Sequence, residues 1–181
     1  MRLEGERIYL RELRVEDAEG NYPNWLNDPE VCRYNSHGEI LYIKEMAIEY
    51  IKSTQDNPAC RVFAICENLS KKHIGNISLQ AISIKNRSAE FAILMGEKSF
   101  WNRGFAKEAG NLLIEYGFKK LSLHRIYCGT SEANIPMQRL ALSLHMKKEG
   151  RRKEALFKND IFYDILEYGI LKKDYIEAQI K

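Results

Sequence analysis

Hydrophobic and polar residues alternate along residues 7–13 (RIYLREL) with the period of two that a half-buried β-strand shows. Further strand-like segments follow at residues 60–66, 73–84, 89–96 and 124–130, and a final pair lies within residues 147–171 around the polar turn Lys158-Asn159-Asp160. Residues 89–96 are more apolar than the others, which predicts a central strand.

Helical spacing of apolar residues is found in three longer segments. Residues 43–54 carry apolar side chains at helical intervals, residues 106–121 have one broad apolar face, and residues 136–146 follow Asn134, a residue type that caps helices. Residues 14–34 predict a short helix broken by Pro23 and then a turn at residues 27–29. Several strands with two long helices predict a mixed α and β fold in one domain, residues 1–181.

Composition narrows the class of protein. The 181 residues are 45% hydrophobic and 29% charged, the profile of a soluble globular protein. A net charge of +3 is too small to indicate a nucleic-acid binder, although it would not repel an anionic ligand. The four cysteines lack the spacing of a zinc site or a disulfide framework, so we expect no metal and a reducing, cytoplasmic location. We expect no signal peptide from the charged start and no membrane span, because no apolar run approaches about 18 residues.

The segment FWNRGFAKEAG, residues 100–110, places a lone glycine where a helix begins after a strand. The first amides of a helix lack intrahelical partners and carry partial positive charge, so such a turn can bind an anion. The segment lacks the second glycine of a dinucleotide loop and the Gly-Lys-Ser/Thr end of a P-loop, which disfavours nicotinamide cofactors and ATP. From these residues alone it is either an anion site or an ordinary strand-to-helix turn.

In its wider context this segment resembles the GNAT acetyltransferases, and within them the Rim-type ribosomal-protein N-acetyltransferase branch. The resemblance runs from RIYLRELRVEDAE through WLNDPEV, HIGNISL and FWNRGFAKEA to the C-terminal EGRRKEALFKNDIFYDILEYGIL. It implies an α+β fold with a central, mostly antiparallel sheet of about six or seven strands, splayed at the cofactor strand and flanked by about four helices. It also implies transfer of an acetyl group from acetyl-coenzyme A to a primary amine.

The resemblance assigns cofactor contacts residue by residue. In the family loop pattern Arg/Gln-x-x-Gly-x-Gly/Ala, the loop amides hold the pyrophosphate of coenzyme A. Gly104 and Ala106 match this pattern, and Trp101 takes its first position, as an aromatic residue often does in this branch. The preceding strand pairs its backbone with the pantetheine arm. Asn134 matches an asparagine that binds the pantetheine, and it can cap a helix at the same time. The implied cofactor-binding residues are Leu94, Met95, Gly96, Trp101, Asn102, Arg103, Gly104, Phe105, Ala106, Lys107 and Asn134.

Two glutamates are candidates for the base that accepts the amine proton. Glu90 matches the position of the general base in the histone-acetylating branch, although a strand glutamate can also simply bond a neighbouring strand. Glu132 matches a glutamate of related sugar acetyltransferases. The tyrosine that protonates the departing thiolate in many relatives is replaced by Ala141, and the serine frequent in the Rim-type branch by Met137. Ser143, His145 or water would then have to supply this proton.

The acceptor is expected between the first helices and the last hairpin. Tyr34, Asn35 and Ser36 are the candidate substrate-binding residues, whereas Trp25 is interpreted as core. These groups suit an amino-sugar nucleotide or a protein N-terminus, and the sequence does not separate the two. A polyamine is less favoured because no dense acidic cluster is found near these segments, and antibiotic amines stay open.

Two other classes of function remain. The missing acid allows a coenzyme-A-binding sensor without catalysis. The basic segment KKEGRRKEALFK allows a nucleic-acid binder, but acidic and apolar residues interrupt it and strand alternation would divide its charges. The resemblance also allows a homodimer through the final strands, where GNAT folds often associate.

Overall fold

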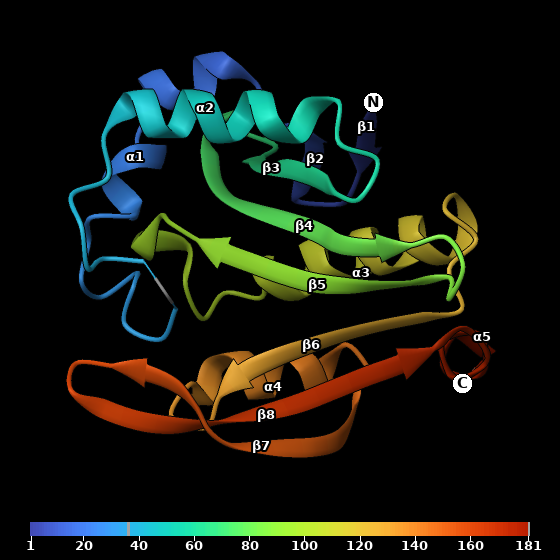
Figure 1. The fold of residues 1–181 in the computed structure, drawn as a ribbon. Helices are drawn as coiled ribbons and strands as arrows, with labels where there is room; N and C mark the ends of the chain where they lie inside the picture. Colours follow the sequence, from blue (N-terminus) through green and yellow to red (C-terminus); the bar gives the residue numbers. More distant parts are fainter. Residues whose placement is uncertain (36, 181) are drawn as a thin grey trace.

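The computed structural model describes residues 1–35 and 37–180, which form one eight-stranded sheet with helices on both faces (Figure 1). The strand order is β1-β2-β3-β4-β5-β6-β8-β7. Neighbouring strands are antiparallel except β5 and β6, which are parallel. The strands are β1 (Arg2–Glu4), β2 (Ile8–Glu12), β3 (Arg61–Glu67), β4 (His73–Ser83), β5 (Ser88–Met95), β6 (Arg125–Ser131), β7 (Lys147–Lys158) and β8 (Ile161–Leu171).

The helices divide between the two faces of the sheet. Two 3₁₀ turns, η1 and η2, accompany five α-helices, and their bounds are η1 (Val15–Glu19), α1 (Tyr22–Trp25), α2 (Lys44–Gln55), η2 (Lys98–Phe100), α3 (Phe105–Lys119), α4 (Ile135–Ser143) and α5 (Lys172–Ile180). One core packs α3 and α4 against the sheet, and a second packs η1, α1 and α2 against β2 and β3 on the other face. Both faces of β3 are therefore covered, which explains why this strand is apolar without strict alternation.

The α3 segment forms a helix because its apolar residues repeat with helical spacing and its interior holds no proline. Ala109, Leu113 and Phe118 are fully or almost fully buried on its inner face. Gly110 allows α4 to approach closely, because a Cβ at this position would lie 2.7 Å from Leu144 Cδ1. The two helices thus form one layer behind the strands that carry the site.

The predicted fold class is confirmed, with three differences in detail. The sheet has eight strands rather than six or seven, because the three residues of β1 extend its edge beside β2. The terminal helix α5 was not predicted, since its segment has no clear apolar face. Pro23 does not break a helix but lies in the first turn of α1, where a missing amide hydrogen costs nothing.

Candidate active site

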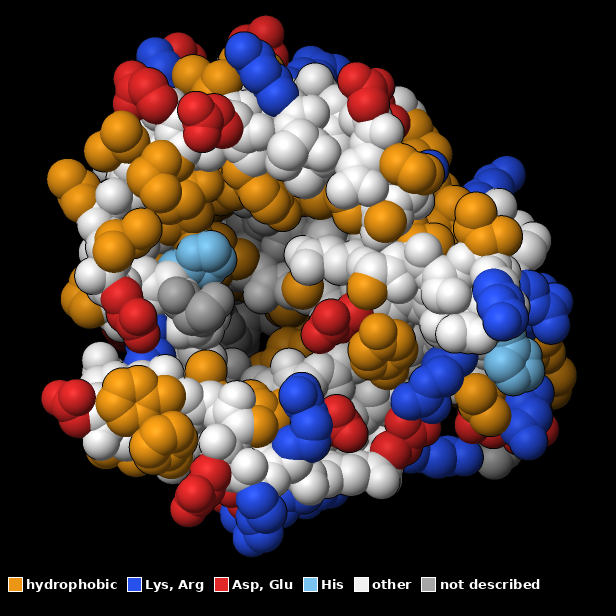
Figure 2. Space-filling view, viewed as in Figure 1, with side chains coloured by type: hydrophobic (Ala, Val, Ile, Leu, Met, Phe, Trp, Pro, Cys, Tyr) orange, Lys and Arg blue, Asp and Glu red, His pale blue; other side chains and the backbone are white. Residues whose placement is uncertain are grey.

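The sheet opens between β5 and β6. β5 pairs with β4 as far as Met95, but it pairs with β6 only over Ser88–Glu90. Beyond Tyr127, β6 pairs with β8 alone. The last residues of β5 therefore have a free edge. Figure 2 shows the molecular face hollowed between the half that carries α2 and the half that carries β7 and β8.

Backbone alternation decides which residues of β5 present hydrogen-bonding groups to this opening. The Gly96 amide donates to the Ile74 carbonyl at 3.0 Å, and the Leu94 carbonyl oxygen would lie 2.4 Å from a Cβ at Gly75. Leu94 and Gly96 therefore direct their backbone groups toward β4, and Ile93 and Met95 direct theirs toward the opening. Ile93 was missed by sequence reasoning because this alternation depends on the β4 register.

Gly96 has a different structural task. Trp25 packs so closely on it that a Cβ would lie 1.9 Å from the indole Cδ2. The indole nitrogen donates to Glu97 Oε1 at 3.1 Å, and only 4% of Trp25 is exposed. Trp25 is therefore a core residue that fixes the end of β5 against α1.

The loop that follows β5 leads into an uncapped helix start. Asn102 and Gly104 have φ values of +57° and +83°, and Gly104 is the N-cap of α3 without a side-chain cap. Trp101 Nε1 donates to the Met95 carbonyl at 2.8 Å, which ties the loop to the strand. The buried Phe105 ring packs against Phe100, with the ring centroids 5.2 Å apart. The backbone amides at the start of α3 are thus held in place beside the end of β5.

The two basic residues near this loop, Arg103 and Lys107, differ in their contacts. Arg103 Nη1 donates to the Ser99 carbonyl at 3.2 Å, and its guanidinium lies 5.5 Å from the Phe105 ring. Lys107 is exposed and Ala106 half-buried in the first turn of α3.

Arg7 and Glu108 form a clamp on the same loop. Arg7 Nη1 donates to the Arg103 carbonyl at 2.9 Å, and Glu108 accepts hydrogen bonds from Arg7 Nε and from the Arg7 and Ile8 amides. The two residues are about a hundred positions apart in the chain, so no sequence signal pairs them. This clamp couples β2 to the start of α3.

Asn134 caps α4, as the sequence predicts. Its Oδ1 accepts a hydrogen bond from the Met137 amide at 3.2 Å. Its side-chain amide nitrogen has no partner among the described residues, so the cap and a ligand contact are compatible.

Glu90 lies where the sheet opens. It is the last β5 residue paired with β6, opposite Tyr127, and it is half-buried. Its side chain shares a face with Leu94, which packs in the α1–α2 core, and faces away from Phe91 in the α3 core. The described residues provide no hydrogen-bond or ion-pair partner for this carboxylate, so it is available to accept a proton.

Glu132 is engaged elsewhere. Its Oε2 lies 2.7 Å from Arg151 Nη2, and its Oε1 accepts from the Asp164 amide at 3.2 Å. The carboxylate therefore joins the end of β6 to the β7–β8 hairpin.

The candidate acid positions on and after α4 differ in their surroundings. Ala141 is fully buried in the α3 core. The Ser143 hydroxyl donates to the Leu140 carbonyl in its own helix, and His145 is exposed beyond the helix end.

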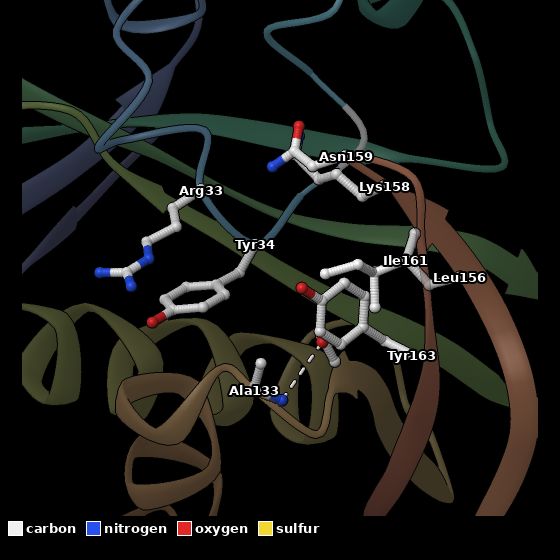
Figure 3. A pocket seen from close by; sticks show the side chains of 9 residues that line it. Arg33, Tyr34, Ala133, Leu156, Lys158, Asn159, Ile161 and Tyr163 are labelled. Carbon is white, nitrogen blue, oxygen red and sulfur yellow. Dashed lines mark hydrogen bonds between the residues drawn. The ribbon is translucent and has the colours of Figure 1, made fainter.

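A cavity of about 460 Å³ lies at the mouth of the opening. It is lined by Arg33, Tyr34, Ser131, Ala133, Leu156, Lys158, Asn159, Ile161 and Tyr163. Figure 3 shows Tyr34 entering it from the loop after α1 and Tyr163 from β8. Tyr34 thus lies where the sequence places the acceptor. Asn35 directs its side chain to the His37 amide in its own loop, and Ser36 lies outside the described residues.

The sequence profile of the family described as "Acetyltransferase (GNAT) domain" matches residues 7–147. This chain belongs to the GNAT acetyltransferase family. It is 30% identical to the uncharacterized N-acetyltransferase p20 of Bacillus licheniformis, over 94% of this chain and 96% of the relative. It is also 30% identical to a spermidine N(1)-acetyltransferase of Vibrio cholerae, over 84% of this chain and 80% of the relative.

Solved structures agree with this assignment. The crystal structure of spermidine N-acetyltransferase from Vibrio cholerae in complex with CoA and spermine superimposes with a TM-score of 0.86, at 25% identity, over 95% of this chain and 99% of that one. This GNAT protein is thus an N-acetyltransferase whose acetyl donor is acetyl-coenzyme A. The Rim-type branch is not singled out, because similar proteins include spermidine enzymes and, at lower identity, one named as a ribosomal N-acetyltransferase. No helix in residues 1–35 and 37–180 has the length and apolarity needed to cross a membrane.

Proposed function

We propose that this protein moves the acetyl group of acetyl-coenzyme A by direct attack of a primary amine within a ternary complex, and that the acceptor is an amino-sugar nucleotide or a protein N-terminus. The observation that carries the proposal is the junction of the free β5 edge with the uncapped start of α3. An extended arm can pair with the free β5 edge, and a pyrophosphate fits the uncapped start of α3. Because the two features are adjacent, they suit a molecule that has both an extended arm and a pyrophosphate.

In this assignment the chain holds coenzyme A mainly through its backbone. Amides between Asn102 and Lys107 bind the pyrophosphate, and the backbone of Ile93 and the Met95 amide pair with the pantetheine arm, because the Met95 carbonyl already accepts from Trp101 Nε1. Arg7 and Glu108 keep the loop in its left-handed conformation. The side-chain amide of Asn134 contacts the pantetheine while its oxygen caps α4.

Glu90 is proposed as the base. A primary amine is mostly protonated near neutral pH, so a group at the opening must take up its proton, directly or through water. Glu90 is unpaired among the described residues and half-buried at the opening, whereas Glu132 is bound to Arg151. A thiolate with a pKa of about 8.5 is a fair leaving group, so water can protonate it in the absence of a tyrosine at Ala141.

The test compares Glu90→Gln with Glu132→Gln. We expect Glu90→Gln to lower kcat at least about 100-fold, the usual contribution of a general base, while the Kd for acetyl-coenzyme A stays within about twofold. Glu132→Gln serves as the matched control and should keep most of the turnover. The reverse ranking would assign the base to Glu132. Absence of turnover with every amine tested, with intact cofactor binding, would favour a coenzyme-A sensor instead.

A polyamine acceptor is the second candidate, because a similar protein is named as a spermidine N(1)-acetyltransferase. Polycations are held by carboxylates, so this candidate requires an acidic acceptor site. Turnover of spermidine against an amino-sugar nucleotide and a free peptide N-terminus ranks the acceptors.

A further inference from the structure

We propose that the acceptor carries an anionic group, a phosphate or a carboxylate, which binds between Lys158 and Arg33 in the cavity at the mouth of the opening. This inference rests on the proposed function and specifies the acceptor of that site. It begins with the charges of the lining. Of the nine described residues that line the cavity, two are basic and none is acidic.

Lys158 is buried without a counterion. Only 7% of this residue is exposed, and its Nζ donates to the Asn35 carbonyl at 2.5 Å and to the His37 carbonyl at 2.7 Å. An ammonium has three N–H groups, so one remains after these two bonds. No carboxylate forms an ion pair with Lys158 among the described residues. Burying a charge without a partner is unfavourable, and an anionic ligand would neutralise it.

The positive charge of Lys158 affects the neighbouring residue His37. Burial first, and then the Lys158 ammonium, lowers the pKa of His37 below its usual value. His37 is therefore neutral near pH 7 and adds no charge of its own to the loop.

Arg33 supplies a second cation. It is exposed, it forms no ion pair with any described residue, and its guanidinium lies 5.3 Å from the Tyr34 ring. In the view of Figure 3, Arg33 and Lys158 lie on either side of Tyr34. Both side chains line the same cavity, so an anion bound there is attracted by two positive charges.

Several acidic residues in the same segments are paired with basic side chains, and Asp160, which follows the lining residue Asn159, is exposed in the hairpin turn outside the lining. Glu132, which follows the lining residue Ser131, is paired with Arg151. Asp28 and Glu30, in the same loop as Arg33, are both paired with Lys98. These pairs leave the cavity with positive charge, which opposes a polycationic acceptor such as spermidine.

The site also sets the length of the acceptor. β6 runs from Tyr127 beside Glu90 to Ser131 in the cavity wall, a rise of roughly 13 Å at strand spacing. An acceptor whose amine reaches Glu90 while its anion contacts Lys158 must therefore be extended. A nucleotide-linked amino sugar or an extended peptide with an acidic residue near its N-terminus has this form.

The experiment measures acceptor binding by calorimetry, without and with saturating coenzyme A, so that it does not depend on turnover. One pair of probes is UDP-glucosamine and glucosamine. The other is a C-terminally amidated pentapeptide with aspartate at its fourth position and the same amidated peptide with asparagine there. Spermidine is the polycationic comparison.

We expect the anionic member of at least one pair to bind about tenfold or more tightly than its neutral partner, the effect of one charge-assisted hydrogen bond. Whichever pair shows the preference identifies the source of the anion. Arg33→Ala and Lys158→Met should each remove most of this preference. Lys148→Met, an exposed lysine of the same hairpin outside the cavity lining, should leave it unchanged.

Because Lys158→Met also removes the hydrogen bonds to the Asn35 and His37 carbonyls, Lys158→Arg is measured beside it and should retain the preference. Equal binding within both pairs, tighter binding of spermidine, or a preference that survives Arg33→Ala and Lys158→Met would overturn the inference. Failure to bind coenzyme A would instead count against the cofactor site. The two failures are distinguishable because the preference for an anionic acceptor is also measured without coenzyme A.

Discussion

Gly104 determines the shape of the loop before α3 because its φ of +83° lies in the left-handed region. A side chain there is strained, and a Cβ would also meet Arg7 Nη2 at 3.2 Å. The strain of a left-handed L-residue is about 1–2 kcal/mol. Loss of this conformation would turn the amides at the start of α3 away from a bound pyrophosphate.

We therefore predict that Gly104→Ala lowers the free energy of unfolding by about 1–2 kcal/mol and weakens acetyl-coenzyme A binding by roughly tenfold, as the same strain converts to affinity. Denaturant unfolding and calorimetry measure the two effects. Gly20→Ala is the control, because Gly20 has a φ of −89° and an added Cβ would meet nothing closer than 3.5 Å. Equal effects of the two substitutions would contradict the role assigned to Gly104.

For single residues, the sequence predicts those structural roles that depend only on neighbours in the chain. Gly104 as a helix start and Asn134 as a cap follow from neighbouring residues in the chain, and both are confirmed. The Arg7–Glu108 clamp and the burial of Lys158 could not be predicted, because each depends on segments brought together by the fold.

Among the elements, the β7–β8 hairpin carries an acidic residue with a strongly shifted pKa. The hydrogen bond from the Glu154 amide, and then the ion pair with Arg151, lower the pKa of Asp164 to about 2. Glu154 has a φ of +48° where the register of the hairpin shifts, so this amide bond holds an irregular part of β7. The same Asp164 residue binds Glu132 through its own amide.

This shift predicts a pH dependence of stability. An unfolded aspartate has a pKa of about 3.9, so between this value and about 2 the unfolded chain binds more protons at Asp164 than the folded protein. The stabilisation from Asp164 is therefore present above about pH 4 and lost as the pH falls toward 2. The difference in unfolding free energy between the wild type and Asp164→Asn should shrink over that range. Asp160→Asn removes the same charge from the hairpin turn and serves as the control; a difference independent of pH would contradict the prediction.

The sequence predicts most helices and strands but not which strands pair with each other. Helices α2, α3 and α4 and strands β2 to β8 follow from periodicity and turn residues, whereas β1 is too short and α5 too weakly amphipathic to be recognised. Periodicity also does not show that β6 leaves β5 after Glu90. The assignment of Ile93 and Met95 to the open edge therefore required the pairing of β5 with β4.

The whole molecule assembles the site from segments distributed along the chain. The loop after α1, the end of β6 and the β7–β8 hairpin line one cavity, and the end of β5 is tied to the loop that begins α3. Figure 2 shows the hollowed face of the molecule. The likeness to spermidine acetyltransferases extends over the fold, while the charge of this cavity is positive. The proposed acceptor therefore follows from the charge of this cavity and not from the shared fold, because function resides in the site.

The most direct test of the cofactor site is thermal unfolding with and without saturating acetyl-coenzyme A, with NADH and ATP as controls. Ligand at a hundred times its dissociation constant stabilises the folded state by about 2.7 kcal/mol. For a chain of this size the midpoint should rise by roughly 5–10 °C with acetyl-coenzyme A and much less with either control. No rise with acetyl-coenzyme A, or an equal rise with NADH or ATP, would contradict the assignment of the β5 edge and the α3 start as the acetyl-coenzyme A site.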